Sequence, residues 1–201
     1  MTKVKFCGLT RPEDISYSNE LMPDYVGFVM WDKSRRSVSS DAAKVLKDKL
    51  SPAIRAVGVF VDEDVRVVAS LLNDGVIDIA QLHGGEDEEY IKELRSRTYN
   101  QIIKAFRIRS SNDVINANAS SADLILLDAG MGGGVSFDWG LIKDVKRPYI
   151  LAGGLDCTNV EDAIVTLSPF GVDVSSGIET DHVKDHEKMR GFIDKVRKIK
   201  Q

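Results

Sequence analysis

The chain alternates short apolar runs with longer stretches in which apolar residues recur at helical spacing. Such runs, bounded by polar or small residues, are typical of buried parallel strands, and the amphipathic stretches between them are typical of covering helices. We expect strands at Val4–Cys7, Tyr25–Met30, Ala56–Val61, Ile79–His83, Ile102–Arg107, Leu124–Asp128, Tyr149–Ala152 and Val172–Val174. The helical patterns include Glu13–Leu21, Asp41–Lys49, Val65–Asn73, Asp87–Arg97 and Lys184–Ile199.

Eight strand–helix units follow one another without a Pro/Ser-rich linker or a shift in composition. This series predicts an α/β fold, a single (β/α)8 TIM barrel over residues 1–201, rather than an open doubly wound sheet. The length lies at the lower edge for this fold, so insertions must be few. Inward side chains alternate along barrel strands, which places Lys5 with Cys7 and Gln81 with His83. The first and last strands are neighbours, so we expect Lys5 to pair with Asp173 inside the barrel.

Two strands near the end of the chain finish in small residues, Gly153-Gly154 and Ser175-Ser176-Gly177. Small side chains let backbone N–H groups approach an anion, and phosphate commonly binds after the last two strands of such barrels. We expect a capping box at Thr158–Glu161 between them and a short helix near Ser176. Two ordinary tight turns are the alternative, but their joint occurrence favours a phosphate site.

Two side chains at strand ends are candidates for acid–base chemistry. Cys7 precedes Gly8 and a capping box expected at Thr10–Glu13, and a nearby positive charge or helix N-terminus lowers a thiol pKa. It is therefore either a base or nucleophile, or an inert buried cysteine. Asp128 ends an apolar strand, where desolvation would raise its pKa and suit it to act as a general acid. A turn or capping role is its alternative.

Several basic residues have more than one interpretation. Arg35 and Arg36 follow the second strand, where a guanidinium could bind a substrate carboxylate or simply be solvated. His83 is a candidate for substrate contact, although a structural, hydrogen-bonded role is favoured. Lys104 could form a Schiff base or a paired interior charge. The Gly130–Gly134 run lacks the spacing of a dinucleotide-binding fingerprint, but it could close over a ligand.

Composition narrows the range of partners and compartments. The net charge of -4 and the pI near 5.5 argue against nucleic acid or an anionic membrane as partner. We expect no membrane span, because no apolar run approaches about 20 residues, and no signal peptide. Two cysteines, Cys7 and Cys157, are too few for a disulfide framework or metal cluster. We therefore expect a cytoplasmic protein with free thiols and no metal.

A set of motifs spread over the whole chain resembles the phosphoribosylanthranilate isomerase family. These motifs are Lys5–Thr10, Gly27–Val29, Ser34–Arg36, Val57–Phe60, Gln81–Gly84, Phe137–Trp139, Leu151–Leu155 and Gly171–Glu179. The resemblance implies a (β/α)8 barrel that catalyses an Amadori rearrangement in tryptophan biosynthesis, converting an aminoaldose phosphate to an aminoketose phosphate without a cofactor. Its substrate would be a small phosphorylated molecule, and the protein a monomer or homodimer.

The resemblance also assigns roles to residues. It implies that Cys7 is the general base and Asp128 the general acid, and that Arg36 binds the anthranilate carboxylate. Gly154, Ser175, Ser176 and Gly177 would surround the phosphate, with Gly153 and His83 also in the substrate site. The loop Gly132–Ser136 departs from the family pattern, because it is one residue shorter and lacks a hydroxyl before Val135. We therefore assign no phosphate contact to this loop.

Two other functions compete with this interpretation. A related barrel isomerase would act on the bis-phosphorylated aminoaldose of histidine biosynthesis, but no second glycine–serine turn matches the other phosphate. A non-catalytic sugar-phosphate-binding protein would need only residues 149–179, which would leave Cys7 and Asp128 unexplained.

Overall fold

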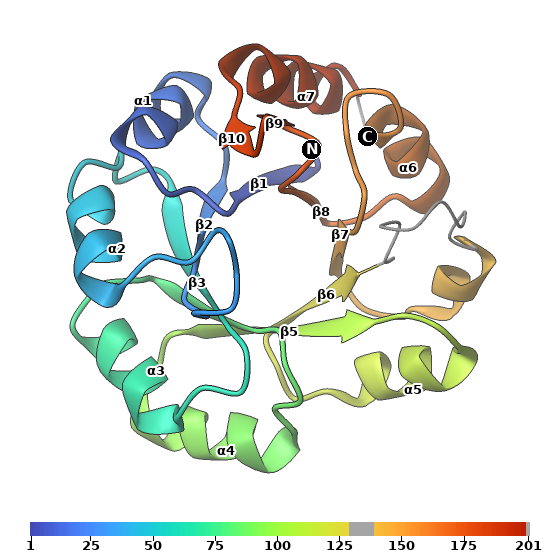
Figure 1. Ribbon diagram of the computed structural model, residues 1–201. Helices are drawn as coiled ribbons and strands as arrows, with labels where there is room; N and C mark the ends of the chain where they lie inside the picture. The colour runs from blue at the N-terminus through green and yellow to red at the C-terminus, as the bar shows by residue number, and fades with distance from the viewer. Residues whose placement is uncertain (129–138, 200–201) are drawn as a thin grey trace.

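Eight parallel strands pair in chain order and close into a barrel in the computed structural model, which describes residues 1–128 and 139–199 (Figure 1). Closure is made by β8 pairing with β1, which sets Lys5 opposite Asp173. The barrel strands are β1 Lys3–Cys7, β2 Tyr25–Val29, β3 Arg55–Phe60, β4 Ile79–Leu82, β5 Gln101–Arg107, β6 Leu124–Asp128, β7 Tyr149–Ala152 and β8 Gly171–Val174. The predicted barrel is confirmed, and each predicted strand end lies within one residue of the observed one.

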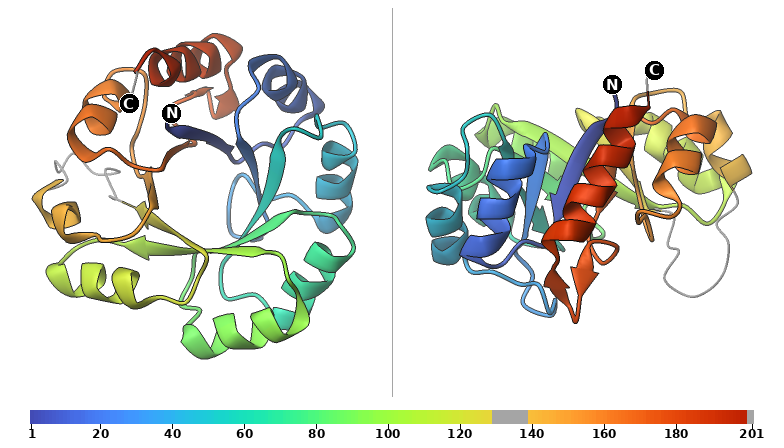
Figure 2. Two further views of the ribbon diagram at one scale, coloured as in Figure 1. Left: turned by 180° about the vertical axis from the view of Figure 1, so that it is seen from behind. Right: turned by 90° about the horizontal axis from the view of Figure 1, so that it is seen from above.

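Helices surround the barrel and connect successive strands (Figure 1). They are α1 Pro12–Leu21, α2 Ser40–Lys47, α3 Val65–Asn73, α4 Glu88–Arg97, α5 Ser111–Ala119, α6 Val160–Leu167 and α7 His186–Lys198. Between β6 and β7 the described residues form a 3-10 helix, η1 Trp139–Asp144. A hairpin of β9 Glu179–Thr180 and β10 Val183–Lys184 lies between β8 and α7. It projects from the end of the barrel opposite the N-terminus (Figure 2, right).

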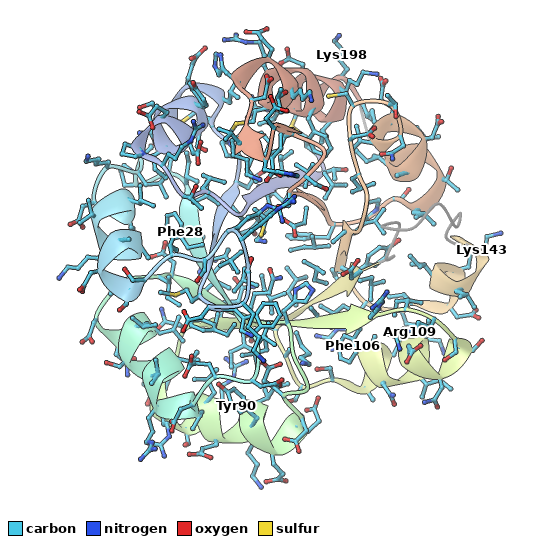
Figure 3. All side chains as sticks on the ribbon, viewed as in Figure 1. Phe28, Tyr90, Phe106, Arg109, Lys143 and Lys198 are labelled. Atoms are coloured by element: carbon cyan, nitrogen blue, oxygen red, sulfur yellow. The ribbon has the colours of Figure 1, made fainter. Side chains whose placement is uncertain are left out.

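Strand alternation divides the apolar residues into two cores. Nine residues, including Val57, Ile103 and Ile150, fill the barrel interior, and a larger cluster fills the layer between strands and helices. Phe28 belongs to that outer layer, whereas the labelled Lys143 and Lys198 lie on the outer rim (Figure 3). Because successive side chains of a strand point to opposite faces, β2 to β7 contribute to both cores, whereas the inward positions of β1 and β8 include the charged Lys5 and Asp173.

Two predicted capping boxes and one predicted short helix differ from the structure, and each difference has a local reason. At α1 the capping carboxylate is Asp14, not Glu13, because its Oδ2 accepts from the backbone N–H groups of Thr10 and Arg11. At α6 the N-cap is Asn159 without a side-chain cap bond, so the capping box from Thr158 is not formed. No helix begins near Ser176, since the chain there turns into the β9–β10 hairpin.

Lys104 points into the outer layer and not into the barrel. Its ammonium binds Glu86 Oε2 and Gly84 O, both at 2.8 Å. Its neighbours Ile103 and Ala105 occupy the barrel interior instead. Lys104 is therefore a paired structural charge on the helix side, and the inward position considered from the sequence is wrong.

Candidate active site

A cavity of about 350 Å³ opens at the carboxyl ends of the strands, where the predicted site residues meet. Because all eight strands are parallel, their carboxyl ends lie at the same end of the barrel. The cavity is lined by Cys7, Val29, Trp31, Arg36, Val59, Val61, Gln81, His83, Asp128, Ala152, Gly153, Gly154, Leu155, Asp173, Ser175 and Ser176. Of the residues to which the family resemblance assigns a role, all except Gly177 line this cavity, whereas the other candidates Arg35 and Lys104 do not.

Cys7 ends β1 with its side chain on the inner face of the barrel, beside Gly27 of β2. A side chain at position 27 would place its Cβ 2.8 Å from Cys7 Sγ and 3.1 Å from Lys5 Nζ. Glycine there leaves room for the thiol and the ammonium to occupy the same part of the interior. The thiol is 8 % exposed, so it has little contact with water.

The pKa of the Cys7 thiol is raised, which corrects the expectation of a lowered value. Burial raises it most strongly, the positive charge of Lys5 opposes this effect, and the negative charge of Asp173 adds to it. At the N-terminus of α1 the N–H groups of Thr10 and Arg11 donate to the Asp14 carboxylate and not to the thiol. The geometry therefore gives a thiol that holds its proton at neutral pH.

The predicted pair of Lys5 and Asp173 is present inside the barrel. Lys5 Nζ lies 3.0 Å from Asp173 Oδ1, and the two side chains are 1 % and 9 % exposed. Burial alone would lower the pKa of Lys5, but the charges of Asp173 and Cys7 outweigh it, so the pKa is raised. Asp173 also lines the cavity, so the pair links the barrel interior to the site floor.

Asp128, His83 and Gln81 form a row across the opposite side of the cavity. The Gln81 amide nitrogen lies 2.8 Å from His83 Nδ1, and His83 Nε2 lies 3.6 Å from Asp128 Oδ2. With Gln81 donating to Nδ1, a neutral imidazole carries its hydrogen on Nε2, facing the carboxylate. Among the described residues, the Gln81 Oε1 atom has no hydrogen-bond partner although it is buried. The alternation of inward residues predicts Gln81 at this position, but nothing in the sequence indicates this unpaired acceptor.

Arg36 reaches the cavity from the loop after β2, and its guanidinium is bound by Glu179. Arg36 Nε lies 2.6 Å from Glu179 Oε1, and Nη2 lies 2.8 Å from Oε2. Arg35 is 3.4 Å from the same carboxylate and half exposed. The structure thus distinguishes the two arginines, since only Arg36 lines the cavity. In the sequence Glu179 is only the last residue of the Gly171–Glu179 motif, and nothing there predicts this contact.

The two small-residue turns lie side by side at the end of the cavity. Gly153 and Gly154 have φ values of 93° and 68°, which glycine adopts without strain. A Cβ at Gly177 would lie 2.0 Å from Leu155 O, so the second turn packs directly against the first. Among the described residues, no acceptor binds the backbone N–H groups of Gly154 and Ser176. Within the part of the chain that the structure describes, both groups are therefore available to bind an anion.

A lysine outside the two turns supplies positive charge beside them. Lys184 of β10 places Nζ 2.9 Å from Ser175 O and 2.7 Å from Glu179 Oε1. Burial lowers its pKa, although Glu179 opposes this effect. Ser175 Oγ in turn donates to Cys7 O at 3.0 Å. The positive charge beside the two turns therefore comes from the hairpin that follows them.

Two further expectations concern the Gly130–Gly134 run and membrane spans. The Gly130–Gly134 run lies outside the described residues, so its expected closure over a ligand stays a prediction. Among helices of the described ranges, none is both long enough and apolar enough to cross a bilayer.

Comparison with known proteins identifies relatives over the full length of the chain. The family model of N-(5'-phosphoribosyl)anthranilate isomerase matches residues 4–195. The N-(5'-phosphoribosyl)anthranilate isomerase of Clostridium acetobutylicum is 44% identical, with 100% of both chains covered.

Solved structures agree with this similarity. A crystal structure of monomers generated from the dimeric phosphoribosylanthranilate isomerase of Thermotoga maritima has a TM-score of 0.88 and is 36% identical over 99% of this chain and all of that one. A phosphoribosyl anthranilate isomerase in complex with reduced 1-(o-carboxyphenylamino)-1-deoxyribulose 5-phosphate has a TM-score of 0.86 and 35% identity, again covering 99% and 100%. With the barrel, the cavity and the sequence in agreement, the chain belongs to the N-(5'-phosphoribosyl)anthranilate isomerase family.

Proposed function

We propose that the chain converts N-(5-phosphoribosyl)anthranilate to 1-(2-carboxyphenylamino)-1-deoxyribulose 5-phosphate, with Cys7 as general base and Asp128 as general acid. The observation that carries this assignment is that one cavity takes in both groups, Arg36 and the two glycine turns. The thiol comes from β1 and the carboxylate from β6, so they approach a bound sugar from different strands. The reaction is an aldose–ketose isomerisation of tryptophan biosynthesis.

Asp128 starts the reaction in this proposal. Its carboxyl group gives a proton to the furanose ring oxygen as the bond from that oxygen to C1′ breaks, and the anthranilate nitrogen forms a Schiff base with C1′. The Cys7 thiolate then removes the C2′ proton. The electron pair of the broken C2′–H bond forms the double bond of an enolamine, which tautomerises to the ketone. General acid and base groups each contribute about 10²–10⁴-fold to such steps.

The raised pKa of Cys7 affects its work as a base in two ways. At neutral pH most of the thiol is protonated, which limits the fraction of active enzyme. The thiolate that does form binds a proton more strongly than an ordinary cysteine and is a better acceptor for the C2′ proton. We therefore expect activity to rise with pH as Cys7 ionises.

The substrate would lie across the cavity between its two anionic ends. Its anthranilate carboxylate would bind Arg36, and its phosphate would bind the N–H groups of the turns Gly153-Gly154 and Ser175-Ser176-Gly177. The buried charge of Lys184 beside Ser175 would favour the anion without a direct contact, because its three donors are directed at Ser175 O, Ser175 Oγ and Glu179. His83 would contact the substrate beside Asp128.

The remaining properties follow from this function and from composition. We expect a cytoplasmic enzyme that needs no cofactor or metal, acts as a monomer or homodimer, and binds neither nucleic acid nor membrane. The relative from T. maritima described as dimeric makes a homodimer the state to test first. Sedimentation at micromolar concentration would distinguish the two states.

Turnover of the expected substrate tests the proposal directly. Freshly prepared N-(5-phosphoribosyl)anthranilate should lose its anthranilate fluorescence on addition of the protein. The bis-phosphorylated aminoaldose of histidine biosynthesis, assayed in parallel, should react far more slowly. No turnover of the first substrate, or faster turnover of the second, would contradict the assignment.

A further inference from the structure

We propose that Glu179 is the positioning residue for Arg36, holding one edge of the guanidinium so that its other edge receives the substrate carboxylate. This inference rests on the proposed function, in which Arg36 binds the anthranilate carboxylate. Glu179 does not line the cavity, so it acts through Arg36 and not by touching substrate.

The contact between Glu179 and Arg36 uses a defined edge of the guanidinium. Both carboxylate oxygens are engaged, at 2.6 Å from Nε and 2.8 Å from Nη2. A guanidinium presents five N–H donors in a planar fork, and two parallel bonds fix its plane as well as its position. Among the described residues, no acceptor binds Nη1. The end formed by Nη1 and Nη2 therefore remains for a second carboxylate.

Gly8 fixes the path of the Arg36 side chain from the opposite side. A Cβ at Gly8 would lie 2.4 Å from Arg36 Cδ and 3.4 Å from Arg36 Nε, and Gly8 has a φ of 77°. The aliphatic part of Arg36 thus crosses the backbone directly after Cys7. Arg36 is held between this crossing and Glu179, so its free end has little freedom of direction.

The charges around Glu179 leave this region positive. One carboxylate, with a 5 % exposed side chain, contacts Arg36, Lys184 and the half-exposed Arg35. Burial would raise the pKa of Glu179, but hydrogen bonds from Arg36 and Lys184 outweigh it and lower the pKa to about 2. The two arginines and Lys184 share the single negative charge of Glu179, so the cluster has a net positive charge and attracts a further carboxylate. The charge of Glu179 also reduces the repulsion between the three cations.

Kinetics of Glu179→Gln test the inference against a purely structural role. The variant should raise KM for N-(5-phosphoribosyl)anthranilate about tenfold, the loss expected for one charge-assisted hydrogen bond, with a smaller change in kcat. It should not change KM for N-(5-phosphoribosyl)aniline, which lacks the carboxylate. In an Arg36→Met background, adding Glu179→Gln should change nothing further, because its effect passes through Arg36.

Two additional variants keep the test informative. Glu179→Gln leaves Lys184 buried without its carboxylate and could reduce folding, so the double variant Glu179→Gln with Lys184→Met removes both charges. Its loss of the Lys184 charge should affect both substrates equally through the phosphate, so KM for the anthranilate substrate should still rise about tenfold relative to KM for the aniline analogue. Glu161→Gln makes the same chemical change in a more exposed ion pair, with Lys195 on the outer helices, and serves as the control. It should leave KM unchanged.

Three results would overturn the inference. If Arg36→Met raises KM but both Glu179 variants leave it unchanged, Glu179 does not position Arg36. If Glu179→Gln raises KM equally for the aniline analogue, it acts on the phosphate turn through Lys184. If Arg36→Met itself has no effect on KM, the proposed role of Arg36 is wrong, and the inference about Glu179 is wrong with it. The Arg36→Met variant alone therefore distinguishes a failure of the proposed function from a failure of this inference.

Discussion

Replacing Lys5 by Met should destabilise the barrel and make Cys7 harder to ionise at the same time. The ammonium of Lys5 is 1 % exposed and 3.0 Å from Asp173. Breaking a buried pair by removing one partner typically costs about 3–5 kcal/mol, because the other charge remains buried. Asp173 is 9 % exposed and lines the cavity, so it can reach water or take up a proton. We therefore expect a loss near the lower end, about 3 kcal/mol.

That loss is large compared with the stability of a typical domain, about 5–15 kcal/mol. For a chain of this size, about 2–4 °C of melting temperature corresponds to each kcal/mol, which gives a fall of about 6–12 °C. Urea unfolding measured by circular dichroism would report the free energy directly. A double variant, Lys5→Met with Asp173→Leu, should recover most of the lost stability, because it leaves no unpaired charge in the interior.

The effect on Cys7 has a sign that can be tested separately. Lys5 lowers the pKa of the thiol and Asp173 raises it, so Lys5→Met should move the pKa further up and Asp173→Asn should move it down. The pH dependence of thiol alkylation by iodoacetamide, in a Cys157→Ser background that leaves one cysteine, would measure both shifts. The limb of kcat/KM that depends on the thiolate should move in the same directions. An unchanged free energy of unfolding for Lys5→Met, or pKa shifts of the same sign in both variants, would refute this reasoning.

Four further expectations concern the site. Cys7→Ser and Asp128→Asn should each lower kcat by at least about 10²-fold with a smaller effect on substrate affinity, measured by anthranilate fluorescence, and near-normal turnover would remove that residue from the mechanism. Arg36→Met should raise KM, whereas Arg35→Met should do little, because only Arg36 lines the cavity; equal effects would indicate a general positive rim. Inorganic phosphate should raise the melting temperature of the parent and of Thr166→Asp, a control for the added charge. It should not raise the melting temperature of Ser176→Asp, whose added charge repels the anion. If phosphate protected all three proteins, its binding site would lie elsewhere. Because the pKa of Glu179 falls to about 2 on folding, its stabilising contribution is complete above about pH 4.5 and is lost as the pH falls towards 2. In a series of urea-unfolding measurements between these pH values, Glu179→Gln should make the free energy of unfolding depend less on pH. An unchanged pH dependence would contradict this expectation.

Residues whose neighbours are set by strand alternation could be predicted from the sequence. The period of two along β1 and β8 placed Lys5, Cys7 and Asp173 on one face, and parallel pairing then brought Lys5 to Asp173. The same logic brought Asp128 and His83 to one cavity. Lys104 is the exception, since its strand lies between two apolar cores and neither face was marked by polar residues.

The β9–β10 hairpin could not be predicted from its sequence. Its strands have two residues each, too few to show a period, and its two turn residues, Asp181 and His182, both have positive φ values. Turns of this kind usually contain Gly or Asn, so Asp-His gave no signal. The positions of Glu179 and Lys184 depend on this hairpin, and their contact with Arg36 and Ser175 was therefore missed.

Closure of the barrel by β1 and β8 makes the environment of Cys7 a late product of folding. The two members of the Lys5–Asp173 pair are 168 positions apart in the sequence, so the contact requires nearly the whole chain. During synthesis, Cys7 leaves the ribosome long before the strand that carries Asp173. A nascent or truncated chain would thus carry an ordinary, accessible thiol in place of the buried one. The decrease in the alkylation rate of Cys7 would therefore report when the barrel closes, without a measurement of turnover.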